Sequence, residues 1–117
     1  MSPIVSTPKP PYFAVIFTSL KRSTDLDDYG GTAQRMVELA SQQPGYLGME
    51  HVGDSAGAAI TISYWSSLEA IQNWRDHGEH SQAQAKGREK WYEHYSLRIC
   101  RVERDVEFQH PQSSSQP

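Results

Sequence analysis

Residues 45–65 read GYLGMEHVGDSAGAAITISYW, and this stretch contains two runs of residues that are typical of β-strands. The second run alternates, so that Ile60 and Ile62 fall on one face of a strand and Thr61 falls on the other. The segment between the runs, residues 53–57, is rich in glycine and small polar residues. Two strand-like runs joined by a short turn-rich segment predict a β-hairpin.

A helix is predicted directly after the hairpin. Ser66 and Glu69 have the spacing of a capping box, in which the serine hydroxyl binds a backbone amide at the start of a helix. The residues expected to face inward are Leu68, Ile71, Trp74 and Gly78. The continuation as far as Glu93 is polar and contains glycine, so we expect a break near residues 78–80 and a more exposed second segment.

Another helix is predicted before the hairpin. Residues 23–25, Ser-Thr-Asp, offer side-chain oxygens for an N-cap, and apolar residues then recur every three or four positions as far as Ala40. This helix should end before Pro44. Gly30 and Gly31 lie inside it, at a cost of about 1 kcal/mol per glycine relative to alanine. We therefore expect the helix either to be irregular there or to pack closely against another element.

The two ends of the domain have strand character. Residues 12–20 are mostly β-branched and aromatic, which predicts a strand buried on both faces. In the last apolar run, from Tyr95 to Phe108, the alternation changes phase, and a β-bulge near residues 99–101 would explain the change. The order βαββαβ predicts an α+β ferredoxin-like fold, in which a four-stranded antiparallel sheet carries its helices on one face. The other face then needs a cover, and a second copy of the sheet is the simplest one.

The composition suggests the domain boundaries and excludes some partners. Six of the seven prolines lie outside residues 12–108, so we expect a proline-rich tail at 1–11, one domain at 12–108 and a disordered tail at 109–117. The net charge of -3 comes without a basic cluster, which argues against binding of nucleic acid. We expect no membrane span and no signal peptide, because no apolar run is long enough for either. A cytoplasmic location is therefore expected.

Several segments together resemble one known family. They are residues 43–50 (QPGYLGME), residues 62–74 (ISYWSSLEAIQNW), His80, residues 91–92 (WY) and residues 101–104 (RVER). In this combination the chain resembles the antibiotic biosynthesis monooxygenase (ABM) domain over residues 12–108. The resemblance implies a homodimer in which two ferredoxin-like sheets face each other as a dimeric α/β barrel. Members of that family differ in activity: some oxygenate polycyclic phenols and anthrones to quinones without a cofactor, some degrade haem, some handle small signalling molecules, and many have no assigned activity.

Haem degradation is the less favoured of these activities. In the haem-degrading members of the family that this chain resembles, a tryptophan bends the porphyrin and a histidine ten residues later binds iron. Trp74 matches the tryptophan, but Gln84 stands where the histidine would be. The asparagine that those enzymes carry on their first strand is absent from residues 13–20.

Aromatic residues are the first candidates for a binding site. Trp65 and Trp74 could form the walls of a pocket for an aromatic substrate between the helices and the sheet. Four tyrosines could add hydrogen-bonding groups, namely Tyr46, Tyr64, Tyr92 and Tyr95, and of these we take Tyr64 as the candidate. The alternative is that both tryptophans are core anchors and that the tyrosine has a structural role at a sheet or dimer boundary. We take the three as candidate substrate-binding residues.

Three histidines are candidate catalytic bases. His77 and His80 are three residues apart and could share one side of a helix, and His51 lies in the hairpin in phase with Met49. A neutral imidazole can remove a phenolic or C–H proton from a bound substrate. The alternatives are a solvated helix end for the pair and a hydrogen-bonded core histidine for His51. No metal site is expected, because the spacing fixes too few ligands.

No cofactor is expected, because the sequence contains no glycine-rich nucleotide fingerprint, phosphate-binding loop or nucleophile elbow. Together with the resemblance, this predicts a cofactor-independent monooxygenase that acts on a small electron-rich hydroxyaromatic substrate. Such a substrate, once deprotonated in a dry pocket, can itself transfer an electron to O2. The alternative is a non-catalytic dimeric barrel that binds a small apolar ligand in a stress or regulatory role.

Overall fold

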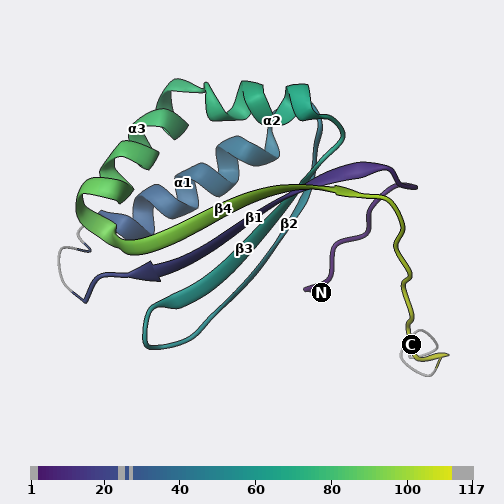
Figure 1. The fold of residues 1–117 in the computed structure, drawn as a ribbon, viewed down its shortest axis with the longest axis horizontal. Coiled ribbons are helices and arrows are strands. Elements are labelled where there is room, and N and C mark those ends of the chain that lie inside the picture. Colours follow the sequence, from purple (N-terminus) through teal and green to yellow (C-terminus); the bar gives the residue numbers. More distant parts are fainter. Residues whose placement is uncertain (1–2, 24–25, 27, 112–117) are drawn as a thin grey trace.

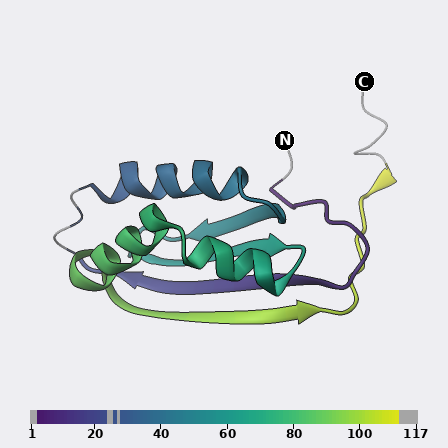
Figure 2. The same cartoon turned by 90° about the horizontal axis from the view of Figure 1, so that it is seen from above.

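The order of the elements confirms the predicted fold, with one additional helix. The structure, a computed structural model, describes residues 3–23, 26 and 28–111. Within these residues the elements are β1 (Tyr12–Lys21), α1 (Tyr29–Ser41), β2 (Tyr46–Gly53), β3 (Ala58–Trp65), α2 (Leu68–Arg75), α3 (Gly78–Lys86) and β4 (Tyr92–Val102), with a π-helical turn at Gly87–Trp91 (Figure 1). The strands form an antiparallel sheet in the order β2-β3-β1-β4, and the helices lie on one face of it (Figure 2). This is the α+β ferredoxin-like arrangement, in which the second predicted helix is divided into α2 and α3.

The predicted hairpin is formed by β2 and β3, and Asp54 closes its turn. The Asp54 carboxylate accepts hydrogen bonds from two backbone N–H groups of the turn, at 2.9 and 3.0 Å. Such side-chain bonds favour a turn over continued strand. Gly57 follows with a φ of 101°, a left-handed conformation that residues with a Cβ rarely adopt. The resulting register pairs Thr61 with His51, which places both side chains on the same face of the sheet.

α1 begins later than the sequence pattern indicates. It starts at Tyr29, after Asp28, which has a φ of 65° and provides no side-chain cap. The predicted cap at residues 23–25 is therefore wrong in position, and two of those three residues lie outside the described part of the chain. Gly30 and Gly31 occupy the first turn of α1, and a Cβ added to either would meet no atom within 4 Å. Of the two alternatives expected for these glycines, close packing against another element is therefore wrong.

α2 is capped by Ser67 and not by Ser66. The Ser67 hydroxyl accepts a hydrogen bond from the backbone N–H of Ala70 at 3.0 Å. The shift by one residue leaves Leu68 55% exposed, so its predicted inward orientation is wrong. The buried residues of α2 are Ala70, Ile71 and Trp74. The inward orientation of the last two is confirmed.

The expected break in the second helical region is confirmed. α2 ends at Arg75 and α3 begins at Gly78, and none of the described residues of α3 is buried. The greater exposure predicted for the second segment is therefore confirmed as well. Within the described residues, no helix has both the length and the apolar composition that crossing a membrane would require.

β4 pairs with β1 in a register that continues without interruption through residues 99–101. The predicted bulge at that place is wrong, and the register shift lies at Lys21, toward the other end of the strand pair. β4 ends at Val102, whereas Val106 and Phe108, whose phase had suggested the bulge, lie beyond the strand and are exposed. Cys100 and Val102 belong to the same phase but lie within β4, so apolar residues occur on both faces of an unbroken strand there.

The core lies between the helices and one face of the sheet. It consists of Leu39, Ala40, Trp65, Ala70, Ile71 and Trp74. Trp65 is fully buried, at 0% exposure, and its ring packs edge-to-face on that of Tyr46 with centroids 5.5 Å apart. Gly45, at a φ of 88°, allows the chain to pass close to Ala70, because a Cβ there would lie 2.5 Å from the Ala70 Cβ. Truncating a buried tryptophan costs about 3–5 kcal/mol, so Trp65 is a main anchor of this core.

The opposite face of the sheet is covered in part by the segment that precedes β1. The backbone N–H of Val5 donates a hydrogen bond to Glu50 Oε2 of β2 at 3.0 Å. Gly48 allows this approach, because a Cβ at that position would collide with the Val5 side chain. Beyond this contact, Val52 and Ile60, which pair across β2 and β3, remain 67% and 41% exposed. The outer face therefore keeps an apolar surface.

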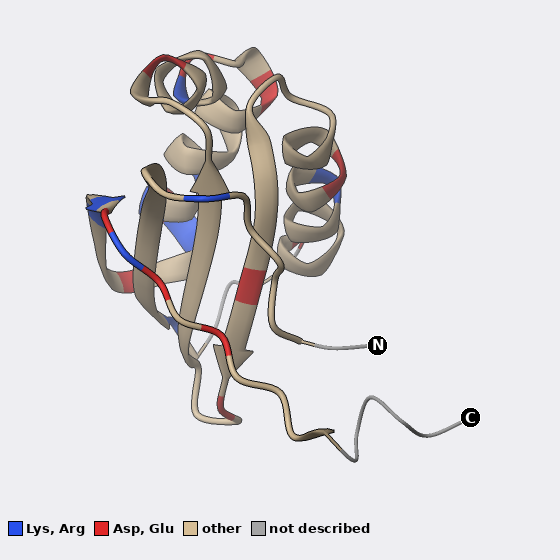
Figure 3. Ribbon diagram, turned by 90° about the vertical axis from the view of Figure 1, so that its right-hand side faces the viewer, with Lys and Arg blue, Asp and Glu red and all other residues tan. Residues whose placement is uncertain are grey.

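The chain segments before β1 and after β4 meet at one end of the sheet. The Tyr12 hydroxyl donates a hydrogen bond to Asp105 Oδ2 at 2.5 Å, and the Thr7 hydroxyl lies 3.2 Å from the same oxygen. Burial, followed by the hydrogen bond to Asp105, raises the pKa of Tyr12, so the phenol stays protonated and continues to donate. Charged residues of both signs follow one another along residues 103–107 after β4 (Figure 3).

Candidate functional site

A cavity of about 480 Å³ lies between the helices and the helix-facing side of the sheet. Its floor includes Val15 and Phe17 of β1, and its other walls include Met36 of α1, Ile71 of α2 and Trp91. Most of the lining residues are apolar or aromatic. A volume within roughly 300–1,000 Å³ and a mainly apolar lining are typical of sites that hold small organic molecules. We therefore take this cavity as the candidate active site.

His80 lines the cavity, and the backbone determines which of its nitrogens carries a hydrogen. Nδ1 lies 3.0 Å from the carbonyl oxygen of Trp74, and the imidazole stacks on the Trp74 indole with centroids 4.2 Å and planes 9° apart. Because a carbonyl can only accept, Nδ1 carries the hydrogen and Nε2 of the neutral ring has the free lone pair. Burial lowers the pKa of His80 below its ordinary value of 6.5. The bond to the carbonyl opposes this shift, and the positive charges of His77 and Arg75 add to it. At neutral pH, His80 is therefore an uncharged base.

Trp74 forms a wall of the cavity, whereas Trp65 supports it from the core. Trp74 lines the cavity with only 8% of its surface exposed to solvent. The two indole rings are stacked, with centroids 6.4 Å and planes 24° apart. Trp65 does not line the cavity, and its indole N–H donates a hydrogen bond to Ser63 Oγ at 2.9 Å. The structure thus places one candidate tryptophan at the site and the other directly behind it.

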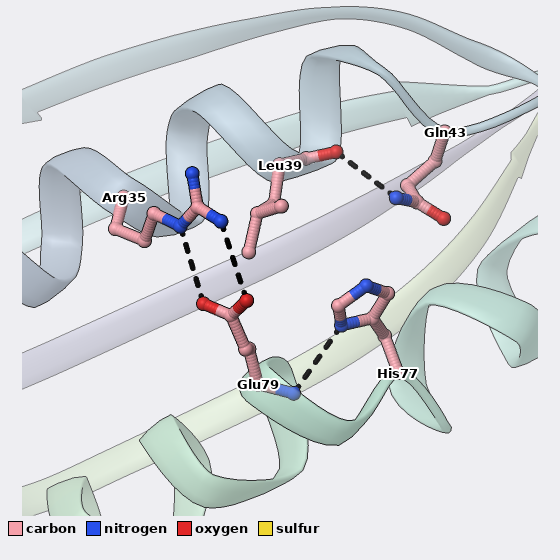
Figure 4. A network of polar contacts seen from close by, with 5 residues as sticks. All are labelled: Arg35, Leu39, Gln43, His77 and Glu79. Carbon is pink, nitrogen blue, oxygen red and sulfur yellow. Dashed lines mark hydrogen bonds and ion pairs between the residues drawn. The ribbon is translucent and has the colours of Figure 1, made fainter.

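His77 caps α3 and does not line the cavity. Its Nδ1 accepts a hydrogen bond from the backbone N–H of Glu79 at 3.3 Å (Figure 4). The Glu79 carboxylate binds the guanidinium of Arg35 from α1 through two contacts of 3.2 and 3.3 Å (Figure 4). This pairing lowers the pKa of the Glu79 carboxyl group. His77 therefore belongs to the polar contacts that join α3 to α1, on the solvent side of the helices.

His51 reaches the cavity from the sheet. Its Nδ1 lies 2.7 Å from Thr61 Oγ1 on the neighbouring strand, and both residues line the cavity. The side chain is exposed, so the alternative of a core histidine is wrong. His51 and His80 thus approach the same space from opposite layers. Among the described residues, no group of three or more His, Cys, Asp or Glu side chains is placed to hold a metal ion.

Tyr64 lies on the opposite face of the sheet. Its hydroxyl donates a hydrogen bond to Glu50 Oε1 at 2.6 Å, and the other oxygen of that carboxylate binds the Val5 backbone. Burial, together with the hydrogen bond to Glu50, raises the pKa of Tyr64, so its phenol is neutral at physiological pH. The sheet separates Tyr64 from the cavity.

Sequence reasoning considered Tyr92 as a hydrogen-bonding residue but missed the polar group to which it belongs at one end of the cavity. The Lys21 ammonium nitrogen lies 4.8 Å from the centroid of the Tyr29 ring, and the hydroxyl oxygens of Tyr29 and Tyr92 are 3.5 Å apart. All three residues line the cavity. One signal was available, since Lys21 follows Phe17 and Ser19 in steps of two along β1 and must share their face. The two tyrosines come from other elements and had no such signal.

Comparisons with known proteins identify the family. The profile of the antibiotic biosynthesis monooxygenase family matches residues 12–86. The chain is 53% identical over 103 residues to the uncharacterized protein YqjZ of Bacillus subtilis, and the alignment covers 88% of this chain and 90% of that protein. It is 28% identical over 98 residues to the jasmonate monooxygenase ABM of Pyricularia oryzae, and the alignment covers 80% of this chain and 45% of that protein. The fold is similar to that of SnoaB, a cofactor-independent oxygenase from Streptomyces nogalater, with a TM-score of 0.65 and 9% identity over 82% of this chain and 96% of that chain. The chain belongs to the antibiotic biosynthesis monooxygenase family.

Proposed function

We propose that this protein is a cofactor-independent monooxygenase that acts on a small electron-rich hydroxyaromatic substrate bound in the cavity. The observation that carries the proposal is the state of His80, whose Nδ1–H donates to the Trp74 carbonyl, whose Nε2 has the free lone pair, and whose pKa is lowered. A neutral imidazole at the wall of an apolar cavity can accept a proton from a bound substrate. Membership of the family supports an oxygenase, as do the names of the Pyricularia and Streptomyces proteins.

The reaction requires the protein to position the substrate and to move protons. For an anthrone-type methylene group, His80 Nε2 removes one proton and leaves a delocalised carbanion. The carbanion transfers one electron to O2, and the resulting radical pair recombines with formation of a C–O bond. The proton returns from His80 to the peroxide, and loss of water leaves a carbonyl group. In sum, the methylene group and one molecule of O2 give a carbonyl group and one molecule of water. His51, on the sheet side of the cavity, is the second imidazole available for proton return.

Aromatic side chains are available to hold the ring system of the substrate. Trp74 forms a wall near His80, and farther along the cavity the Phe17 ring contacts those of Tyr92 and Tyr95 with centroids 5.3 and 5.2 Å apart. Aromatic rings arranged in this way favour a planar ligand through stacked and edge-to-face contacts. Arg75 also lines the cavity, and its positive charge favours the anion that forms when the proton leaves.

We also propose that the working form is a homodimer in which the outer faces of two sheets meet. Val52 and Ile60 are exposed on that face, whereas the helices cover the other face (Figure 2). A second copy offers the same apolar surface, which suits a two-fold arrangement. Light scattering should give a mass of about twice the 13.2 kDa of one chain. A mass of 13.2 kDa at low micromolar concentration would contradict the dimer.

A second candidate function is binding of a small apolar ligand without catalysis, in a stress or regulatory role. The observation that favours it is the apolar part of the lining, which includes Val15, Met36 and Ile71. Thermal-shift screening separates the two candidates. A compound that raises Tm and is recovered unchanged supports binding, whereas a compound that is consumed with uptake of O2 supports the oxygenase.

Oxygen uptake tests the proposed reaction. Purified protein treated with a chelator is incubated with a panel of anthrones and hydroquinones, and O2 is followed with an electrode. We expect uptake above the spontaneous rate for at least one compound and its loss in His80→Gln. His77→Gln is the matched control, because it removes an imidazole three residues away that does not line the cavity. Uptake at the buffer rate across the whole panel would contradict the proposal.

A further inference from the structure

The charge of the cavity lining differs in sign from the charge of the chain. The chain carries 14 acidic and 11 basic residues, with a net charge of -3. Among the described residues that line the cavity there are two cations, Lys21 and Arg75, and no Asp or Glu. A site with cationic side chains, low-dielectric walls and no carboxylate attracts anions, because nothing at the site offsets the positive charge. The lining therefore favours a negatively charged ligand.

The position of Lys21 makes it the better defined of the two cations. It is the last residue of β1 and is partly buried at the floor of the cavity. Its ammonium group lies over the Tyr29 ring, at 4.8 Å from the centroid, and forms no ion pair with another described residue. A cation–π contact occupies one side of an ammonium group and leaves its N–H donors available to a further partner. A carboxylate bound there would accept hydrogen bonds from these free N–H groups of the ammonium.

Tyrosine hydroxyls add uncharged donors beside this ammonium. Tyr92, which pairs with Lys21 between β4 and β1, has its hydroxyl 3.5 Å from that of Tyr29. Burial, together with the contact to Tyr29, raises the pKa of Tyr92, so this phenol keeps its hydrogen. An ammonium together with phenol O–H groups matches the hydrogen-bonding needs of a carboxylate, which only accepts.

We propose that Lys21, Tyr29 and Tyr92 form a carboxylate-binding subsite, so that the ligand of this cavity is an aromatic acid. The aromatic body of the ligand lies along Phe17 toward Trp74 and His80, and its carboxylate is held at the opposite end of the cavity. This inference rests on the cavity being the substrate site, and it names the substrate class within the proposed function. The subsite orients the ligand and does not take part in proton transfer, so it can be tested without turnover.

Two matched probes measure the preference for an acid. They are 2-naphthoate and 2-naphthamide, which have nearly the same shape and differ in charge, and their binding is followed by quenching of tryptophan fluorescence. We expect the wild-type protein to bind the acid about tenfold more tightly than the amide, as a single charge-assisted contact provides. Added salt should reduce this difference. Equal affinities for the two probes, or no binding of either, would overturn the inference.

Substitutions then assign the preference to Lys21. Lys21→Met should reduce the affinity for naphthoate to that for naphthamide and leave the amide unchanged, and Lys21→Arg should retain the preference. Lys86→Met is the matched control, because Lys86 also lies over an aromatic ring, that of Trp91 at 5.8 Å, but does not line this cavity. A preference that survives in Lys21→Met, or disappears in Lys86→Met, would overturn the assignment. Because these readouts need no O2, absence of oxygenase activity would contradict the proposed function and leave the subsite standing.

Discussion

Replacing His80 with glutamine tests its role as the base. Glutamine retains a side-chain N–H that can donate to the Trp74 carbonyl, as Nδ1 does at 3.0 Å, so the wall of the cavity is kept. It lacks the basic lone pair of Nε2. Loss of a positioned general base lowers the rate about 10²- to 10⁴-fold, or about 2.7–5.5 kcal/mol in activation free energy. We expect this loss in kcat/KM for O2 uptake, with KM for the organic substrate little changed.

The pH profile of the same assay identifies the group that titrates. Burial holds the pKa of His80 below 6.5, so wild-type kcat/KM should fall only below that pH and should be level at pH 7 and above. Rates measured from about pH 5 to pH 9 should show this inflection in the wild type and not in His80→Gln. The neighbouring charges of His77 and Arg75 act on the same pKa and shift the inflection in the same direction.

His77→Gln provides the control for both measurements. His77 accepts a hydrogen bond from Glu79 at the start of α3, and loss of such a cap lowers the free energy of unfolding by about 1 kcal/mol. Its kcat/KM at pH 7 and above should remain close to that of the wild type. The inflection should remain visible, displaced upward because the charge of His77 no longer lowers the pKa of His80. A His80→Gln protein with wild-type kcat/KM and the same inflection would refute the assignment of His80 as the base.

Three further outcomes are expected. Burial depresses the pKa of His80 in the folded state, so the unfolded state binds more protons below pH 6.5. The free energy of unfolding should therefore decrease as the pH falls from 6.5, and it should decrease less in His80→Gln. Equal decreases for the two proteins in denaturant titrations would contradict this. Trp65→Ala should cost about 3–5 kcal/mol in urea unfolding, against about 0.5 kcal/mol or less for the exposed Leu68→Ala, and similar costs for both would show that Trp65 is not a core anchor. Ile60→Glu should give monomers in light scattering, whereas Val106→Glu, beyond the end of β4, should not; a dimer that survives Ile60→Glu would contradict the proposed interface.

The parts of the fold that sequence predicted well are those that local interactions determine. The hairpin follows from the alternation around Ile60 and from the turn at Asp54, whose carboxylate binds its own backbone. The predicted ends of the helices were less accurate. The spacing to Glu69 favours Ser66 as the cap, whereas the packing of Ala70 and Trp74 in the core goes with a cap at Ser67.

The site could be predicted only in part, because it depends on which face of the sheet the helices cover. Tyr64 and Trp65 are adjacent in sequence and point to opposite faces of β3, so local composition could not separate a core residue from one on the outer face. Lys21, Tyr29 and Tyr92 come from three elements, and only the tertiary structure brings them to one end of the cavity. Apart from the alternation that relates Lys21 to Phe17 and Ser19, such a cluster leaves no periodic signal in the sequence.

Incubation under ¹⁸O2 tests most directly whether the protein oxygenates a substrate without a cofactor. Chelator-treated protein is mixed with an anthrone that supports O2 uptake, and the product is analysed by mass spectrometry. We expect one atom of ¹⁸O in the new carbonyl group, the second atom in water, and little labelled product with His80→Gln. A product that takes its oxygen from water, or labelled product formed equally fast with His80→Gln, would contradict monooxygenation that depends on this base.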